Sequence, residues 1–201
     1  DGAVRYALAA VKGVGEQAMK ELVAERNANG KFANMEDLAN RMPQGVMNKR
    51  QYEKLVSAGV FDSLVPVRSC LQEGAEAYLR YIQSLAEEKA SGQVSLFGGE
   101  SGAGSAMPAF PDIREWDPLE RLRREFDAIG FYISAHPLDT KAEQLERLGI
   151  VPMSAVEGEL MHKSSALLDM AGVLIKKQIR VSPKSGNKYA FLQLSDSSGV
   201  Y

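Results

Sequence analysis

The chain contains few of the residue types that build metal sites and many catalytic centres. Its 201 residues include one cysteine, Cys70, and two histidines, His136 and His162. A single cysteine forms no disulfide within a chain, and these three residues are a poor basis for a zinc site or a hydrolytic triad. We therefore predict no catalytic residues, no metal site and no cofactor within this sequence.

Long apolar runs are also absent. No run approaches the roughly 18 residues of a membrane-spanning helix, and no basic segment followed by an apolar one opens the chain. We expect a cytoplasmic protein with no membrane partner. Because the chain begins at Asp1 rather than Met and ends just after a turn signal, we also expect a segment of a longer protein.

The net charge is small, but the charges are unevenly distributed. The 24 Lys and Arg against 26 Asp and Glu give −2 overall, while residues 1–92 are neutral, residues 93–169 carry −6 and residues 170–201 carry +4. This balance excludes a strongly electrostatic nucleic-acid binder. It does not exclude one that binds through backbone groups.

Helical periodicity dominates most of the chain. Apolar residues recur every three or four positions, and capping signals such as Asn48 and Asp117-Pro118 mark helix starts. The predicted helices are 17–27, 35–42, 48–57, 68–89, 119–129 and 140–149. Between the predicted helices 68–89 and 119–129, residues 91–111 are rich in glycine and serine and carry a single charge. This composition predicts a mobile linker.

The period changes to that of β-strands near the end of the chain. Residues 171–182 and 188–196 alternate around a PKSGN turn, and a third strand is expected from Gly199. Two strands and the start of a third do not form a stable β-domain. We expect them either to pack on the preceding helices or to belong to an incomplete barrel.

Residues 10–16, AVKGVGE, form the strongest local motif. Gly13 and Gly15 permit a sharp turn and a close approach to a partner. The amides of Val14, Gly15 and Glu16 would then lie at the start of the next helix, where backbone N–H groups bind anions. This pattern predicts a phosphate site; the alternative is a turn in which glycine only relieves crowding.

The surrounding stretch AAVKGVGEQAMKELVAERNANGKF resembles the helix-hairpin-helix motif, which binds duplex phosphates without sequence preference. Residues 54–62, KLVSAGVFD, resemble a degenerate second copy in which Phe61 replaces the second glycine. That departure leaves phosphate binding by the second hairpin open. The duplex contacts implied by the resemblance are Lys12, Gly13, Val14, Gly15, Glu16, Lys20 and Gly59.

Four segments in order, RYALAAVKGVGEQAMKELV, FANMEDLANR, NKRQYEKLVSAGVFDSL and EFDAIGFYISAHPLD, resemble one family, the alpha subunit of bacterial DNA polymerase III. In that family a tandem helix-hairpin-helix region follows the catalytic region and precedes an OB-fold. The resemblance covers essentially the whole chain. It implies a mainly α fold with a tandem helix-hairpin-helix domain (1–90), a linker with a clamp-binding peptide (91–111), a helical connector (112–169) and the first strands of a truncated OB-type antiparallel barrel (170–201).

Within the linker, Gln93, Leu96 and Phe97 resemble the Gln-x-x-Leu-Phe peptide by which polymerases bind the sliding clamp. Such a peptide needs an amide anchor, two adjacent apolar side chains for a pocket, and flexible flanks. The alternative is that the apolar pair packs on the nearest surface.

The basic end of the chain combines charge with aromatic residues. An OB-fold could hold a single strand there by stacking bases on aromatic rings and pairing phosphates with basic groups. The candidate contacts are Lys176, Lys177, Arg180 and Lys188, with Tyr189 and Phe191 between them. The alternative is a solvated hairpin whose lysines protect an edge strand.

The resemblance implies a non-catalytic portion of a DNA-directed DNA polymerase that supports processive synthesis. Its implied partners are duplex DNA, the sliding clamp (beta subunit), the single-stranded template and other replisome subunits, with Mg²⁺ bound only by the catalytic region of the parent protein. Two alternatives stay open: the equivalent region of a damage-tolerant paralogue, and a helix-hairpin-helix scaffold or repair module that acts through protein contacts.

Overall fold

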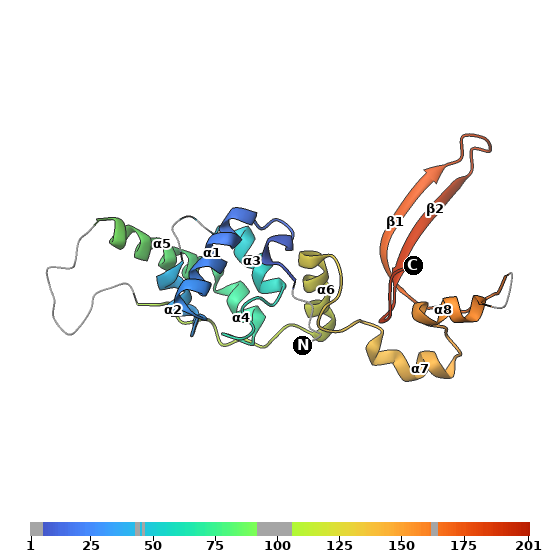
Figure 1. Cartoon of the computed structure of the whole chain (residues 1–201), viewed down its shortest axis with the longest axis horizontal. Coiled ribbons are helices and arrows are strands. Elements are labelled where there is room, and N and C mark those ends of the chain that lie inside the picture. Colours follow the sequence, from blue (N-terminus) through green and yellow to red (C-terminus); the bar gives the residue numbers. More distant parts are fainter. Residues whose placement is uncertain (1–5, 43–44, 46, 92–105, 162–164) are drawn as a thin grey trace. The chain divides into compact units, whose positions relative to one another are not determined.

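The computed structural model describes residues 6–42, 45, 47–91, 106–161 and 165–201. The chain divides into two compact units, Asp1–Phe131 and Tyr132–Tyr201. Among the described residues, the first unit is helical and the second carries both strands (Figure 1).

Short helices around one hydrophobic core build the first unit. In chain order they are the 3-10 helix η1 (Leu8–Ala10) and the α-helices α1 (Glu16–Asn29), α2 (Met35–Arg41), α3 (Lys49–Ser57), α4 (Arg68–Glu73), α5 (Ala75–Ser91) and α6 (Pro118–Ile129). Asn48 caps α3 with a reciprocal capping box, and Asp117 caps α6 with a proline at the first helical position. The helices predicted at these two capping signals are confirmed.

One predicted helix is wrong. The single helix expected over 68–89 is divided into α4 and α5 at Gly74. A methyl group at Gly74 would lie only 2.6 Å from Cδ1 of Phe110, so the glycine lets the Phe110 ring pack against the chain at the break. Periodicity continues across this position, which is why the sequence alone did not reveal it.

Helix α3 is the centre of the core. Tyr52, Leu55 and Val56, the predicted inner face, are completely buried. The Tyr52 ring packs against the ring of Tyr78 from α5, with 5.5 Å between centroids. The Tyr78 hydroxyl donates a hydrogen bond of 2.7 Å to the Met35 carbonyl, which ties α5 to α2.

Residues 112–131 pack into the first unit and not with the stretch to 169 that we predicted as a connector. Ala128 and Ile129 of α6 are part of the hydrophobic core. The ring of Phe110, inside the predicted linker, lies 5.5 Å from the ring of Tyr78. The end of the linker and α6 thus complete the helical core because their apolar side chains find partners there.

The second unit combines short helices with an antiparallel hairpin. Its elements are the 3-10 helix η2 (Asp139–Lys141), α7 (Ala142–Arg147), α8 (Met153–Leu160), β1 (Val173–Val181) and β2 (Lys188–Ser195). Helix α8 was not predicted. The strands pair Arg180 with Tyr189, a bulge lies between Leu174 and Lys176, and a bridge from Ser195 to Val200 begins the expected third strand.

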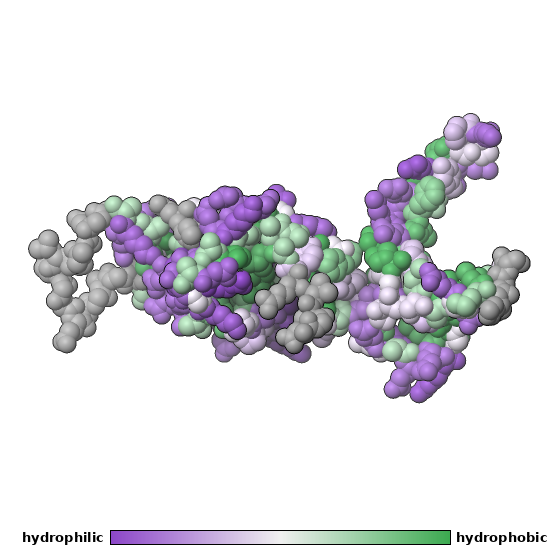
Figure 2. Space-filling model, in the orientation of Figure 1, coloured by the Kyte–Doolittle hydropathy of each residue, from purple (hydrophilic) through white to green (hydrophobic). Residues whose placement is uncertain are grey.

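The hairpin is exposed along most of its length. From Lys176 to Gln193 every residue except Ser182 is exposed, including Ile179 and Phe191. Figure 2 shows hydrophilic and hydrophobic residues side by side along it. The mainly α fold with an antiparallel hairpin is therefore confirmed, whereas the OB-type barrel stays a prediction.

Candidate nucleic-acid interface

The first hairpin joins η1 to α1 and has the geometry that its glycines suggested. Gly13 has a φ of +78°, a left-handed conformation that favours glycine. On either side of it, Val11 and Val14 are buried in the core. Gly15, the N-cap residue of α1, has extended backbone angles and is exposed. The two valines therefore anchor the turn while both glycines lie at the surface.

Two of the three predicted amides are available to a ligand. The Val14 N–H donates to the carbonyl of Val11 at 3.2 Å, so this amide is used within the turn. No described atom accepts a hydrogen bond from the amides of Gly15 and Glu16. The Glu16 carboxylate, which would repel an anion, forms an ion pair of 2.8 Å with Lys20. The start of α1 thus presents two N–H groups next to a compensated carboxylate.

Helix α6 supports this hairpin from the other side of the linker. The Lys12 N–H donates a hydrogen bond of 2.8 Å to the carbonyl of Ala128 near the end of α6. The Lys12 side chain continues over α6, with Nζ 5.7 Å from the centre of the Phe126 ring. A methyl group at Gly130 would lie 3.1 Å from that same Nζ atom. Lys12 therefore has a structural role in addition to its predicted contact with DNA.

Two residues of α3 that we did not single out in the sequence lie beside the first hairpin. A methyl group at Gly13 would be 3.8 Å from Nε of Arg50, and one at Gly15 would be 3.4 Å from Nε2 of Gln51. Neither residue belongs to the glycine motif. No sequence signal marked them, since only the packing of α3 against the hairpin brings them there.

The second turn is built differently. Gly59 also has a left-handed φ, +76°, but its N–H donates to the carbonyl of Val56 at 2.9 Å. The next amide, of Val60, donates to Leu55 at 3.1 Å, and that of Asp62 donates back to Gly59 at 3.2 Å. The amides of Gly59, Val60 and Asp62 therefore close the turn instead of facing a ligand.

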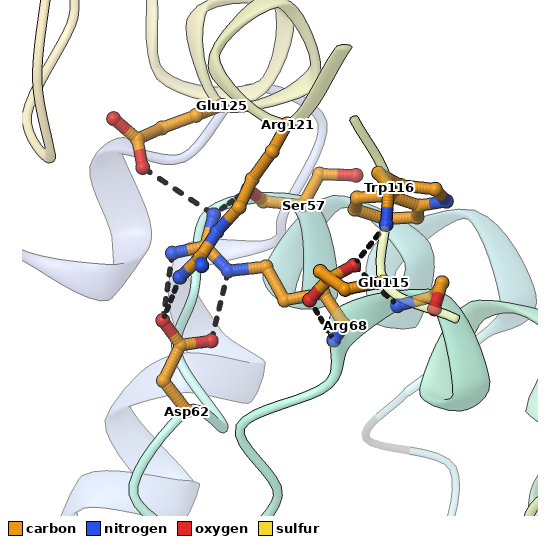
Figure 3. Close-up of polar contacts among 8 residues, drawn as sticks. Ser57, Asp62, Arg68, Glu115, Trp116, Arg121 and Glu125 are labelled. Atoms are coloured by element: carbon orange, nitrogen blue, oxygen red, sulfur yellow. Dashed lines mark hydrogen bonds and ion pairs between the residues drawn. The ribbon is translucent and has the colours of Figure 1, made fainter. Parts of the chain in front are cut away.

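A buried arginine fills the space next to Gly59. The Arg68 guanidinium donates two hydrogen bonds to Asp62, at 2.8 and 2.7 Å, one to the Ser57 carbonyl at 2.9 Å and one to Glu125 at 3.3 Å (Figure 3). Arg121 also donates to Asp62, at 3.2 Å. Burial alone would lower the pKa of Arg68, but Asp62 and then Glu125 raise it above its ordinary value. The charge of Arg68 is thus neutralised by carboxylates inside the protein.

Glu115 fastens the segment after the linker to the start of α4. Its carboxylate accepts hydrogen bonds from the amides of Arg68 at 2.7 Å, Ser69 at 3.2 Å and Trp116 at 2.7 Å (Figure 3). A carboxylate at a helix N-terminus satisfies free N–H groups and interacts favourably with the helix dipole. The start of α4 is therefore occupied by the protein's own side chain.

The strand register divides the basic candidates between the two faces of the hairpin. Paired residues of antiparallel strands share a face. Arg180 pairs with Tyr189, and Phe191, two positions along β2, lies on the same face. The Arg180 guanidinium lies 5.5 Å from the centre of the Phe191 ring, and the two aromatic rings meet edge to face at 5.6 Å. By the same register Lys176 lies on this face, whereas Lys177 and Lys188 lie on the other, with Ile179, Val181, Ala190 and Leu192.

Gln93, Leu96 and Phe97 lie outside the described residues. Within the described ranges, no group of three or more His, Cys, Asp or Glu side chains is arranged to hold a metal ion. No helix in those ranges is long and apolar enough to cross a membrane.

Comparison with known proteins identifies similar sequences over the whole chain. A helix-hairpin-helix motif model matches residues 1–71. The "DNA polymerase III subunit alpha" of Caulobacter vibrioides is 36% identical over 201 residues, which are 100% of this chain and 17% of the relative. The proteins of the same name from Mycobacterium tuberculosis H37Rv and Escherichia coli K12 are 33% and 28% identical, over 98% and 99% of this chain and 17% of each relative. The chain thus spans about a sixth of the length of these relatives.

Proposed function

This chain is a homologue of a segment of the DNA polymerase III alpha subunit, and we propose that it binds duplex DNA as a non-catalytic part of such a subunit. The first hairpin carries the proposal, because after the turn at Gly13 the amides of Gly15 and Glu16 have no described acceptor and both residues are exposed at the start of α1. A backbone phosphate accepts such N–H groups whatever the base sequence. Binding of this kind suits a protein that must move along DNA.

Substitution of Gly15 by valine tests the duplex contact. The extended backbone of Gly15 accepts a branched residue without backbone strain, so Gly15→Val places a side chain next to the two amides and to Nε2 of Gln51. We expect duplex affinity, measured by fluorescence anisotropy, to fall by about tenfold or more. Gly13→Pro should weaken binding by distorting the turn, and Lys12→Ala only modestly. Equal, negligible effects of all three would contradict the contact.

The segment Gln93–Phe97 provides the second part of the proposed function, a tether to the sliding clamp. Gln93 supplies an amide anchor, and Leu96 and Phe97 supply two adjacent apolar side chains for a pocket on the clamp. The duplex contact uses few charges, since residues 1–92 are neutral, and is weak by itself. A tether raises the effective concentration of DNA at the hairpin and so supports processive synthesis.

Replacing Gln93, Leu96 and Phe97 by alanine together separates the tether from the duplex contact. Clamp binding in a pull-down should be lost, because both the anchor and the apolar pair are removed. Duplex affinity should be unchanged. Retention of clamp binding by this variant would contradict the tether.

The aromatic face of the hairpin supports a third contact, with single-stranded template, in the complete OB-fold. Bases stack on Tyr189 and Phe191 while Arg180 and Lys176 pair with phosphates. Phe191→Ala should therefore weaken single-strand binding, whereas Leu192→Ala on the opposite face should not. The reverse result would place the nucleic acid on the other face.

The parent protein, in this proposal, is a cytoplasmic DNA-directed DNA polymerase that transfers nucleotides with Mg²⁺ held outside this segment and works with other replisome subunits. In a damage-tolerant paralogue the clamp peptide would be weak or absent. A scaffold or repair module would bind proteins and show no salt-dependent affinity for duplex DNA. Anisotropy measured over a series of salt concentrations distinguishes the last alternative.

A further inference from the structure

The fold brings the first hairpin and the start of α3 together, although Arg50 lies 37 positions after Gly13 and Gln51 lies 36 positions after Gly15. Built methyl groups on the two glycines would contact Arg50 at 3.8 Å and Gln51 at 3.4 Å, in each case through a nitrogen atom. Nitrogen atoms of both side chains therefore lie at the surface where the free amides of α1 are found.

Gln51 is held in a defined orientation. Its Oε1 accepts a hydrogen bond of 2.9 Å from the Asn48 amide, and its own amide donates to Oδ1 of Asn48 at 3.0 Å. Because Oε1 is used by this capping box, the other end of the side-chain amide, Nε2, must be the end that faces Gly15. No described acceptor takes a hydrogen bond from Nε2. Gln51 thus presents a positioned neutral donor.

Arg50 forms no ion pair with any described residue. It is exposed, and no described carboxylate lies within ion-pair distance of its guanidinium. Its neighbour Lys49, by contrast, is paired with Glu76 at 3.1 Å. The guanidinium of Arg68, which lies next to the second glycine turn, is also paired, with the carboxylates of Asp62 and Glu125. Arg50 is therefore open to an external anion, unlike Arg68.

We propose that Arg50 and Gln51 are further DNA contacts, which hold the same duplex phosphate as the amides of Gly15 and Glu16. This inference rests on the proposed duplex binding and names the side chains that complete it. The phosphate oxygens accept from two backbone amides, from Nε2 of Gln51 and from the Arg50 guanidinium. A neutral hairpin thereby gains one charge-assisted contact from a different helix.

Two substitutions test the proposed contacts without removing the cap of α3. Gln51→Glu keeps an oxygen for the Asn48 amide, and therefore the cap, but replaces the donor by a negative charge. Arg50→Gln removes the positive charge from an exposed position. Arg80→Gln is the matched control. It also removes one exposed positive charge from the first unit, but Arg80 lies outside the hairpin.

The experiment measures anisotropy of a labelled blunt duplex of mixed sequence with the full chain at several salt concentrations. We expect Gln51→Glu to weaken binding by about tenfold or more and Arg50→Gln by a similar factor. Arg50→Gln should also reduce the slope of log affinity against log salt by about one unit. Arg80→Gln should bind within about twofold of the parent chain. Thermal melting confirms that each variant is folded.

The outcomes distinguish a failure of this inference from a failure of the proposed function. If Gly15→Val loses binding while Arg50→Gln and Gln51→Glu bind like the parent chain, the inference fails and the proposed function stands. If the parent chain shows no salt-dependent duplex binding, both fail. Equal losses in Arg50→Gln and Arg80→Gln would also overturn the inference, because the effect would then be that of net charge.

Discussion

Two glycines of the first unit share a left-handed backbone, but their surroundings differ. Gly59 combines a left-handed φ of +76° with the buried Arg68 guanidinium, from which a methyl group would be 2.1 Å away. Gly59→Ala must displace Arg68 from Asp62, so we expect it to lower the free energy of unfolding by about 3 kcal/mol or more. Gly45→Ala, at φ +73° with no described atom within 4 Å, should cost only about 1 kcal/mol. Similar losses in denaturant titrations of the two variants would contradict this account.

We expect His136 to make the stability of the second unit dependent on pH. Its Nδ1 accepts from the Leu138 amide at 3.2 Å, so the proton is on Nε2, 3.1 Å from the Ser195 hydroxyl. Burial lowers the pKa of His136, and this effect outweighs the negative charges of Asp139 and Asp196, which raise it. Below the unfolded value of 6.5 the unfolded state therefore binds more protons than the folded state, and stability is lost as the pH falls through and below this value.

Chemical denaturation at about pH 8 and about pH 5.5 measures this dependence. The parent chain should be less stable at the lower pH, and His136→Gln should lose most of the difference. A His136 pKa above 6.5 in an NMR titration would contradict the assignment.

At the scale of elements, α4 depends on a residue that is distant in the sequence. Glu115 accepts hydrogen bonds from the amides of Arg68, Ser69 and Trp116. We expect Glu115→Gln to destabilise the first unit by about 1 kcal/mol, because a charged acceptor at the helix N-terminus becomes neutral. Glu120→Gln, which removes a half-exposed partner of Arg124, should cost about 0.5 kcal/mol or less. Equal thermal shifts in the two variants would show that the cap contributes no more than a surface ion pair.

At the scale of the whole molecule, the candidate interface belongs to a unit that extends past the linker. Residues 1–91 lack the Ala128 carbonyl that holds Lys12, and they lack the Glu125 and Arg121 side chains of the buried network. A chain ending at Ser91 should therefore melt at a lower temperature and bind duplex at least about tenfold more weakly. The full chain with alanine at Gln93, Leu96 and Phe97 is the control and should keep both properties. Full activity of residues 1–91 would contradict a supporting role for α6.

Local signals in the sequence predicted most elements and the first hairpin. Caps at Asn48 and Asp117, the apolar spacing in α3 and the alternation in β1 and β2 depend on neighbouring residues, so they are visible in one dimension. The left-handed turn at Gly13 follows for the same reason, since glycine is the residue that adopts it without strain. The α4–α5 break and α8 were missed, because neither changes the local pattern strongly.

The sequence by itself determined the family resemblance, the mainly α character and the position of the glycine turn at Gly13, because each of these is carried by residues close together in the chain. The tertiary structure alone decided that α6 belongs to the first unit, that Gly59 faces Arg68 instead of a ligand, and that Arg50 and Gln51 lie beside Gly13 and Gly15. The physical reason is distance along the chain. Contacts between residues tens of positions apart are selected by burial and charge pairing in the folded core, and no local pattern encodes them.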